Sequence, residues 1–254
     1  MAEHFAARLR DRETIVGYWV TSDNAAATER IASVGYDYVC IDLQHGLLDI
    51  AGALNNVIAI EAGGSNSVIR VPANDAAWIG KALDLGARAV IVPMVESADE
   101  ASRAARACRY PPDGVRSFGP MRSSLRIGPA PRTADESVAC IVMIETAAGL
   151  ANADEICATE GIDAVYVGPS DLSIALGGDT PQAGWARPEY PEALATIRRA
   201  AAKAGIACGL HVNDGEAAAA ALAAGFDFVS ISNDLNHILA FTRHELEIAR
   251  AGRS

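Results

Sequence analysis

The sequence predicts a (β/α)8 TIM barrel, a closed ring of parallel strands with helices around it. The chain has 254 residues, a length that fits one such barrel. Four segments ("GYDYVCID", "GARAVIVP", "GIDAVYVG" and "GFDFVSIS") each begin with a glycine that suits a helix end and continue into an apolar run of strand length. These runs are apolar throughout rather than alternating, as expected for a parallel sheet covered by helices.

Eight strands are expected, and most are followed by a helix. The expected strands cover residues 15–20, 36–42, 67–71, 89–95, 138–145, 164–168, 206–212 and 226–231. The expected helices cover residues 23–33, 51–62, 75–85, 97–107, 147–159, 191–204, 214–223 and 235–251. This alternation predicts a single barrel domain over residues 1–254. An open doubly wound sheet is the alternative, but "YWVTSDN" is not the glycine-rich turn expected after its first strand.

Two segments interrupt the alternation. Residues 108–137 and 176–190 contain Pro, Gly and Arg without a clear period, so both are expected to be irregular. Long irregular segments in compact folds are often lids or interface arms. Neither is expected to be a domain linker, because the strand rhythm resumes after each.

Composition limits the partners and the compartment. The formal net charge of −11 repels nucleic acid and anionic membranes, so neither is an expected partner. The five cysteines form no CxxC pair and are expected to be buried and reduced. The N-terminal stretch "MAEHFAARLRDRET" suggests a polar amphipathic helix rather than a signal peptide, and no apolar run approaches the roughly 20 residues that span a bilayer. These features predict a cytoplasmic protein.

Polar residues collect at the expected C-terminal ends of the strands, where barrels of this class carry their active sites. In the stretch "VCIDLQHG", Asp42 ends the second strand and His45 lies in the following turn. Arg70 ends the third strand, Glu145 ends the fifth, and Asp171 follows the sixth. One imidazole, one guanidinium and three carboxylates therefore converge on one rim.

Several rim residues also have a structural interpretation. Asp171 alone would be read as a helix cap, and a lone Arg or Glu at a strand end often fixes a loop. His211, near the end of the seventh strand, is expected to form a structural hydrogen bond, and Trp19 is expected in the core or the pocket wall. Joint placement on the catalytic rim is what favours a functional site.

The rim residues suit the chemistry of 2-oxo acids. Glu145 and Asp171 offer hard oxygen ligands without Cys or clustered His, a set that favours Mg²⁺ or Mn²⁺, which would stabilise an enolate as a Lewis acid. Arg70 can bind a carboxylate in bidentate fashion. His45 would be the base, tuned by a nearby carboxylate, and Asp42 is counted among the catalytic residues. No lysine lies at an expected strand end, which disfavours a Schiff-base aldolase.

Motifs along nearly the whole chain carry a family resemblance. They are "DLQHG", "IRVP", "KALDLGARAVIVPMVES", "YPPDGVRSFGP", "MIETAAGLANADEI" and "GIDAVYVGPSDLSIALG". In this order they resemble the HpcH/HpaI family of metal-dependent class II pyruvate aldolases. The resemblance implies a (β/α)8 barrel that joins the enolate of a 2-oxo acid, pyruvate or hydroxypyruvate, to an aldehyde, or cleaves the resulting 4-hydroxy-2-oxo acid. It also implies a divalent cation (Mg²⁺, Mn²⁺ or Co²⁺) and a homo-oligomer, with the hexamer common in the family.

The resemblance implies roles for individual residues. His45 matches the catalytic base, and Arg70 matches the arginine that binds pyruvate. Glu145 and Asp171 match the metal ligands, and Asp84 matches an aspartate credited with making the histidine more basic. The expected substrate contacts are Arg70, Gly168, Pro169, Ser170, Trp19, Met143 and Phe118.

Two positions depart from the family pattern. Met143 stands where many members carry Gln, and Phe118 replaces a smaller residue in "GVRSFG". Both changes are expected to make the pocket more apolar and to alter its preferred donor and acceptor.

The position of Asp84 predicts a shared active site. Asp84 lies near the end of a helix, at the rim opposite His45, and a strand of about six residues spans roughly 20 Å. If Asp84 acts on a His45, that histidine therefore belongs to a neighbouring subunit. The alternative is that Asp84 only accepts hydrogen bonds at its own helix end.

Two other functions stay open. An acyl-CoA lyase of the citramalyl or malyl type shares the fold and the metal logic, but it needs a cationic site for a CoA phosphate. The candidate residues for that site are Arg109, Arg116, Arg122 and Arg126. A non-catalytic sensor of 2-oxo acids is the third possibility, although a sensor would not need the base His45.

Overall fold

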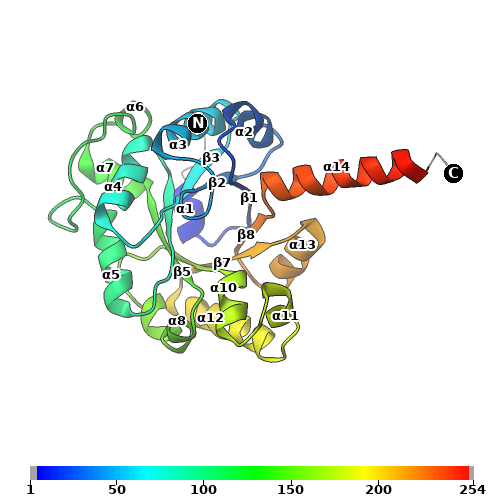
Figure 1. The fold of residues 1–254 in the computed structure, drawn as a ribbon. Helices are drawn as coiled ribbons and strands as arrows, with labels where there is room; N and C mark the ends of the chain where they lie inside the picture. The colour runs from blue at the N-terminus through cyan, green and yellow to red at the C-terminus, as the bar shows by residue number, and fades with distance from the viewer. Residues whose placement is uncertain (1–4, 252–254) are drawn as a thin grey trace.

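Eight parallel strands close into a barrel in the computed structural model, which describes residues 5–251. Each strand pairs with the next along the chain, and β1 pairs with β8 to close the ring. The predicted (β/α)8 TIM barrel is thereby confirmed (Figure 1). The strands are β1 (Ile15–Val20), β2 (Tyr38–Asp42), β3 (Asn66–Arg70), β4 (Ala89–Val92), β5 (Ala139–Ile144), β6 (Ala164–Val167), β7 (Ala207–Val212) and β8 (Phe228–Ile231).

Helices surround the barrel and connect successive strands (Figure 1). Those that match the predicted ranges are α2 (Ala25–Ala32), α3 (Ile50–Ala62), α4 (Ala76–Leu85), α5 (Ala98–Ala107), α12 (Glu189–Ala204), α13 (Gly215–Ala223) and α14 (Asp234–Ala251). The helix expected over 147–159 is divided into α8 (Ala147–Ala151) and α9 (Ala153–Cys157). An N-terminal helix, α1 (Phe5–Arg10), agrees with the amphipathic pattern, whose first four residues lie outside the described part.

The two segments expected to be irregular contain helices, so that expectation was wrong in part. Residues 108–137 include α6 (Ser124–Ile127) and α7 (Pro131–Ser137), and residues 176–190 include α11 (Pro181–Trp185). A further helix, α10 (Pro169–Ala175), follows β6. Three of these four helices begin with proline, which suits the first helical position because that position needs no N–H partner.

The glycines of the four repeated motifs behave as their sequence position predicts. Gly35, Gly86, Gly161 and Gly225 all have positive φ, between 87° and 112°. A side chain in this left-handed region is strained, so glycine ends the helical segment and turns the chain into the next strand.

The hydrophobic core has two layers. One lies between the strands and the outer helices and is rich in Val, Ile and Ala. The other fills the inside of the barrel with Trp19, Tyr38, Tyr166 and Phe228 among its buried members. A Cβ at Gly209 would overlap the ring of Phe228, so the bulky interior side chains depend on small neighbours across the sheet.

The last helix, α14, projects away from the barrel (Figure 1). Only Asp234, at its start, is buried. Large apolar side chains are exposed along its length: Leu235, Ile238, Leu239, Phe241, Leu246 and Ile248. Within residues 5–251, no helix is long and apolar enough to cross a membrane.

Candidate active site

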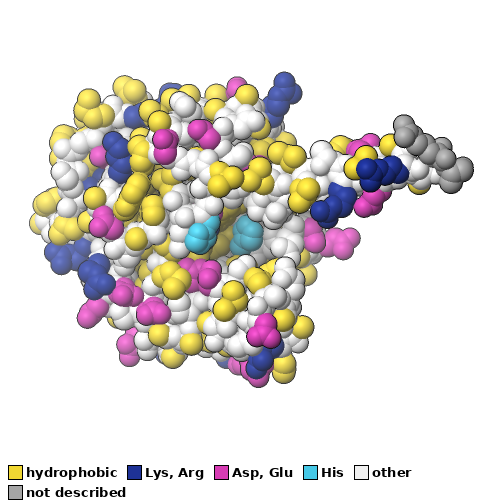
Figure 2. Space-filling view, in the orientation of Figure 1, with side chains coloured by type: hydrophobic (Ala, Val, Ile, Leu, Met, Phe, Trp, Pro, Cys, Tyr) yellow, Lys and Arg dark blue, Asp and Glu magenta, His cyan; other side chains and the backbone are white. Residues whose placement is uncertain are grey.

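A cavity of about 260 Å³ opens at the C-terminal ends of the strands. In Figure 2 it appears as a hollow with histidine and acidic side chains around it. The lining residues are Trp19, Thr21, Asp42, His45, Arg70, Met143, Glu145, Tyr166, Gly168, Pro169, Ser170, Asp171, His211 and Asn233. Ten of the twelve predicted site residues therefore lie together, and Asp84 and Phe118 do not join them within one chain.

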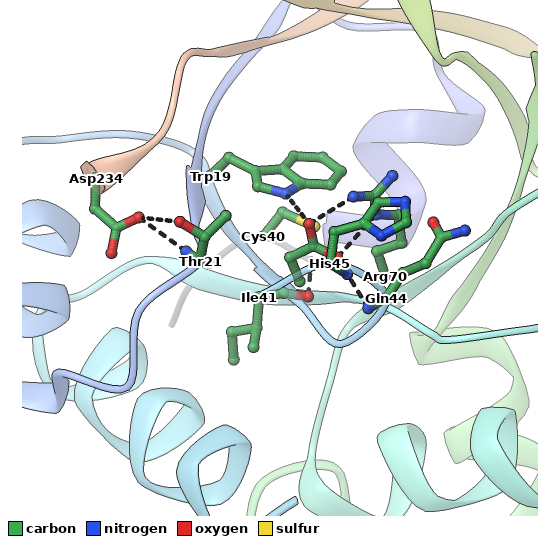
Figure 3. Close-up of polar contacts among 9 residues, drawn as sticks. Trp19, Thr21, Cys40, Ile41, Gln44, His45, Arg70 and Asp234 are labelled. Carbon is green, nitrogen blue, oxygen red and sulfur yellow. Dashed lines mark hydrogen bonds and ion pairs between the residues drawn. The ribbon is translucent and has the colours of Figure 1, made fainter. Parts of the chain in front are cut away.

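Asp42 and Arg70 form the central ion pair of the cavity (Figure 3). Their Cα atoms are partners in the β2–β3 register, so the two side chains leave neighbouring strands at the same level. Arg70 donates through Nε (3.0 Å to Oδ1) and Nη2 to the carboxylate of Asp42, and the indole Nε1 of Trp19 donates to Oδ2 at 3.2 Å. Burial alone would raise the pKa of Asp42, but the hydrogen bonds and charge of Arg70 outweigh it and lower that pKa.

Asp42 also fixes the turn that carries His45. Its Oδ1 accepts the backbone N–H groups of Gln44 at 3.0 Å and of His45 at 3.1 Å (Figure 3). A Cβ at Gly46 would collide with the backbone oxygen of Asp42, so only glycine permits this tight return. Asp42 therefore contacts the backbone of His45, whose imidazole is exposed at the cavity mouth.

Glu145 is buried beside the turn after β6. Its Oε1 accepts the backbone N–H of Met94 at 2.9 Å, and Met94 has a φ of 56°, which is uncommon for a residue with a side chain. A Cβ on Gly168 would overlap Oε2 of Glu145, so this glycine makes room for the carboxylate. Burial, and secondarily the negative charge of Asp171, raises the pKa of Glu145 to about 7.

Asp171 lies in the first turn of α10 and lines the same cavity as Glu145. The capping interpretation of Asp171 is not realised, because the start of α10 has no side-chain cap hydrogen bond. The carboxylates of Glu145 and Asp171 repel each other, and Oε2 of the buried Glu145 accepts no hydrogen bond from residues 5–251. A bound cation would stabilise this pair. Within residues 5–251 no cluster of three or more His, Cys, Asp or Glu side chains forms a metal site, so the pair would supply two protein ligands and leave the other positions to water or substrate.

His211 reaches the cavity without the expected structural hydrogen bond. Its ring packs edge-on against Trp19, with ring centroids 5.3 Å apart, and forms no hydrogen bond or ion pair with the part of the chain that the structure describes. Burial, reinforced by the positive charge of Arg70, lowers the pKa of His211 to about 4. Its imidazole is therefore neutral at physiological pH.

Asp84 lies apart from this cavity in its own chain. Its Oδ1 accepts Nη2 of Arg116 at 2.8 Å, and Arg116 in turn lies over the ring of Tyr110. Phe118, expected at the substrate, is 62 % exposed and packs on Tyr110. Any contact of Asp84 or Phe118 with a substrate would require an active site on another subunit.

The arginines proposed for a CoA phosphate are already paired with carboxylates. Arg109 pairs with Asp163, and Arg116 pairs with Asp84. Arg122 and Arg126 both bind Glu61. None of the four lines the cavity with His45, so the structure gives no support to a CoA site there.

A larger cavity of about 830 Å³ lies among α1, α5, α7 and the turn before β6, away from the strand C-termini. Four arginines line it, and two of them, Arg10 and Arg109, pair with Asp163. Apart from Arg109, a candidate for binding a CoA phosphate, it contains none of the predicted site residues.

Three lining residues were missed by the sequence analysis: Thr21, Tyr166 and Asn233. Tyr166 is hidden in the apolar run of β6, and its ring stacks on Trp19 at the floor of the cavity. Thr21 donates its N–H at 2.8 Å to Asp234, which ties the end of β1 to the start of α14 (Figure 3). For Thr21 and Asn233, a position just beyond a strand end would have been the only signal in the sequence.

Comparisons with known proteins agree with this geometry. A family model described as HpcH/HpaI aldolase/citrate lyase matches residues 16–240. The chain is 41 % identical over 234 residues to a hydroxypyruvate/pyruvate aldolase of Rhizorhabdus wittichii, covering 92 % of this chain and 93 % of that relative. It is 37 % identical over 240 residues to a 4-hydroxy-2-oxovalerate aldolase of Rhodococcus jostii, covering 93 % and 91 % of the two chains.

A solved structure shares the same architecture. The crystal structure of an HpcH/HpaI aldolase/citrate lyase family protein from Burkholderia cenocepacia superposes with a TM-score of 0.87 at 34 % identity. The match covers 96 % of this chain and 98 % of that one.

Proposed function

The chain belongs to the HpcH/HpaI aldolase/citrate lyase family, and from that premise we propose that it is a carbon–carbon lyase that forms and cleaves 4-hydroxy-2-oxo acids with a divalent cation. One observation carries the proposal. The buried carboxylate of Glu145, the exposed carboxylate of Asp171, a guanidinium and an exposed imidazole line a single small cavity at the catalytic end of the barrel. The substrates are a 2-oxo acid, pyruvate or hydroxypyruvate, and an aldehyde.

Arg70 is the binding group for the substrate carboxylate. Its Nε and one N–H of Nη2 are used by Asp42, and Nη1 has no hydrogen-bond partner within residues 5–251, so it can donate to an incoming carboxylate. Because Asp42 and the face of Trp19 hold the guanidinium from two sides, Arg70 is oriented before the substrate arrives.

Glu145 and Asp171 would hold the cation. Two facts support this position: the two carboxylates repel each other, and they offer the hard oxygen ligands that such cations prefer. When bound, the cation supplies Lewis-acid polarisation of the 2-keto oxygen. Mg²⁺ and Mn²⁺ suit two carboxylates completed by water and substrate, and Co²⁺ is the third candidate.

His45 is the base. It removes a proton from C3 of the 2-oxo acid, and the electron pair released forms the new bond to the aldehyde carbon while the aldehyde oxygen gains a proton. Cleavage is the reverse, so the base then takes the proton of the 4-hydroxyl group and the C3–C4 bond breaks. The exposed position of the imidazole at the mouth leaves it open to a proton donor or acceptor above the cavity.

We further propose a cytoplasmic homo-oligomer, with a hexamer as the expected assembly. The exposed apolar side chains of α14 and the separation of Asp84 from its own His45 support an assembly. All five cysteines are buried and free, which suits a reducing compartment.

An aldol-addition screen tests the function. Pyruvate and hydroxypyruvate are offered as donors with a panel of aldehydes, with and without Mg²⁺, Mn²⁺ and Co²⁺. We expect cation-dependent product, and we expect Glu145→Ala and Asp171→Ala to abolish it while the circular dichroism spectrum stays unchanged. Near-wild-type turnover in either variant or in chelated enzyme contradicts the proposal. Release of acetyl-CoA from citramalyl-CoA or malyl-CoA, without cleavage of free 4-hydroxy-2-oxo acids, would favour the acyl-CoA lyase.

A further inference from the structure

His211 is the polar side chain of the cavity to which the proposed mechanism gives no task. Strand alternation explains where it points: Cys208, Leu210 and Val212 pack toward the outer helices, whereas Ala207 belongs to the interior of the barrel. His211 shares the interior face with Ala207 and therefore enters the top of the barrel, where it lines the cavity.

The surroundings of His211 are mostly aromatic. Its ring meets the indole of Trp19 at an interplanar angle of 78°, and Tyr166 stacks on the same indole with centroids 5.9 Å apart. A neutral imidazole carries one N–H donor and one bare nitrogen acceptor. Neither atom has a protein partner within residues 5–251, although a partly buried polar group normally has one. The hydrogen-bonding capacity of the ring is thus directed at whatever enters the cavity.

The charges around the His211 imidazole determine which substrate group it can bind. Arg70 disfavours the protonated imidazole, and burial does so more strongly, so His211 presents no positive charge to a carboxylate. In the proposed function the substrate carboxylate binds Arg70, and Glu145 and Asp171 would hold the cation that polarises the keto group. A hydroxyl group, which both donates and accepts, is the group that matches a neutral imidazole.

We propose that His211 is a specificity-determining residue that hydrogen-bonds a hydroxyl group of the substrate. The inference rests on the proposed aldolase function and names part of its substrate class. The hydroxyl belongs either to the donor, as at C3 of hydroxypyruvate, or to the acceptor, as in a 2-hydroxyaldehyde. Arg70 ends β3 and His211 lies in β7, and these two strands are opposite each other in the ring of eight. His211 and Arg70 therefore reach the cavity from opposite sides.

The test compares substrates that differ by one hydroxyl. The specificity constant kcat/KM is measured with Mg²⁺ for hydroxypyruvate against pyruvate, both with acetaldehyde, and for glycolaldehyde against acetaldehyde, both with pyruvate. The variants are His211→Phe, which keeps a flat ring against Trp19, and His211→Asn, which keeps a donor and an acceptor. His244→Phe removes an exposed histidine of α14 and is the matched control.

We expect His211→Phe to lower by about tenfold either the kcat/KM ratio of hydroxypyruvate to pyruvate or that of glycolaldehyde to acetaldehyde. The ratio that falls shows whether the hydroxyl belongs to the donor or to the acceptor. Turnover of pyruvate with acetaldehyde is the reference for both ratios, since neither substrate carries the hydroxyl group. His211→Asn should restore part of the preference, and His244→Phe should leave both ratios unchanged. If His211→Phe does not fold, His211→Leu gives the same readout with a smaller side chain.

Two results overturn the inference. If the active variant keeps both ratios, or loses activity equally on all four substrates, His211 has a structural or general role and not one in specificity. If wild-type enzyme converts none of the substrates with any cation, the proposed function itself fails, and the inference fails with it. The two failures are distinguished by wild-type activity alone.

Discussion

At the scale of single residues, Asp42 shows how one buried carboxylate can organise a site through its hydrogen bonds to neighbouring groups. It receives two hydrogen bonds from Arg70, one from Trp19 and two from the backbone of the turn that carries His45. An amide at this position keeps one acceptor oxygen, but it loses the second acceptor and the counter-charge of Arg70. The residue is therefore expected to matter for both stability and substrate binding.

We predict that Asp42→Asn lowers the free energy of unfolding by about 3 kcal/mol, because the charge of Arg70 is left uncompensated in a largely buried place. The KM for pyruvate should rise, since Arg70 is no longer oriented. Urea unfolding and initial rates measure the two effects. Lys203→Ala breaks a solvent-exposed pair with Asp154 and should leave the urea unfolding curve close to that of wild type.

The stabilisation by the Asp42–Arg70 ion pair should depend on pH. The pKa of Asp42 is lower in the folded chain than in the unfolded chain, so its stabilisation is present above the unfolded value of about 3.9 and is lost as the pH falls through the folded value. Asp42→Asn should therefore unfold with a weaker dependence on acid than wild type does. Identical acid unfolding curves would refute this role.

The stability contribution of Glu145 should depend on pH in the opposite direction. Its pKa is about 7 in the folded chain, whereas an unfolded glutamate ionises near about 4.3, so the cation-free protein loses stability as the pH rises between these values. A cation binds the ionised form, and its affinity should fall by up to about tenfold for each pH unit below 7. Calorimetric titration of Mg²⁺ at about pH 6 and about pH 8 measures this dependence. Glu145→Gln should abolish Mg²⁺ binding at both, and an affinity independent of pH would contradict the prediction.

At the scale of elements, the junction of β6 and α10 places both predicted cation ligands. Gly168 lies where a Cβ would overlap the carboxylate of Glu145, and Asp171 follows three residues later in the first helical turn. Gly168→Ala should displace Glu145 and lower Mg²⁺ affinity by about tenfold or more, as loss of ligand orientation does in other metal sites.

The matched control for Gly168→Ala is Gly215→Ala. Gly215 begins α13 in open space, so a methyl group there meets nothing. Both variants should fold, and thermal unfolding without cation should show this. If Gly168→Ala binds Mg²⁺ as tightly as Gly215→Ala does, the glycine is not needed to position Glu145.

The elements were more predictable than the contacts between them. The bounds of β1 agree with the expected range because a run of apolar residues and its flanking polar residues are local signals. The short helix α7 was missed because Pro131 reads as a breaker, although it also suits the start of a helix. The bond between Asp42 and Arg70 depends on the β2–β3 register, which no local pattern specifies.

At the scale of the whole molecule, a single chain leaves two features without a partner inside itself. The helix α14 extends from the barrel with its apolar side chains exposed (Figure 1). Asp84, implied by family resemblance to act on the histidine that we propose as the base, lies outside the cavity and binds Arg116. Both features are explained together if copies of the chain associate and Asp84 of one reaches His45 of another.

We therefore predict an obligate homo-oligomer whose active sites are shared between subunits. His45→Ala and Asp84→Ala should each be nearly inactive alone, and Asp84→Asn should shift the pH–rate profile without loss of Mg²⁺ binding. After the two inactive variants are dissociated, mixed and reassembled, activity should partly return, because some mixed interfaces contain one intact His45 and one intact Asp84. Gly80→Ala, on the same helix as Asp84 and with open space around it, is the control for a change in α4 and should be active by itself. A fully active monomer in light scattering, or mixtures that stay as inactive as their components, would show that Asp84 serves only its own helix end and Arg116.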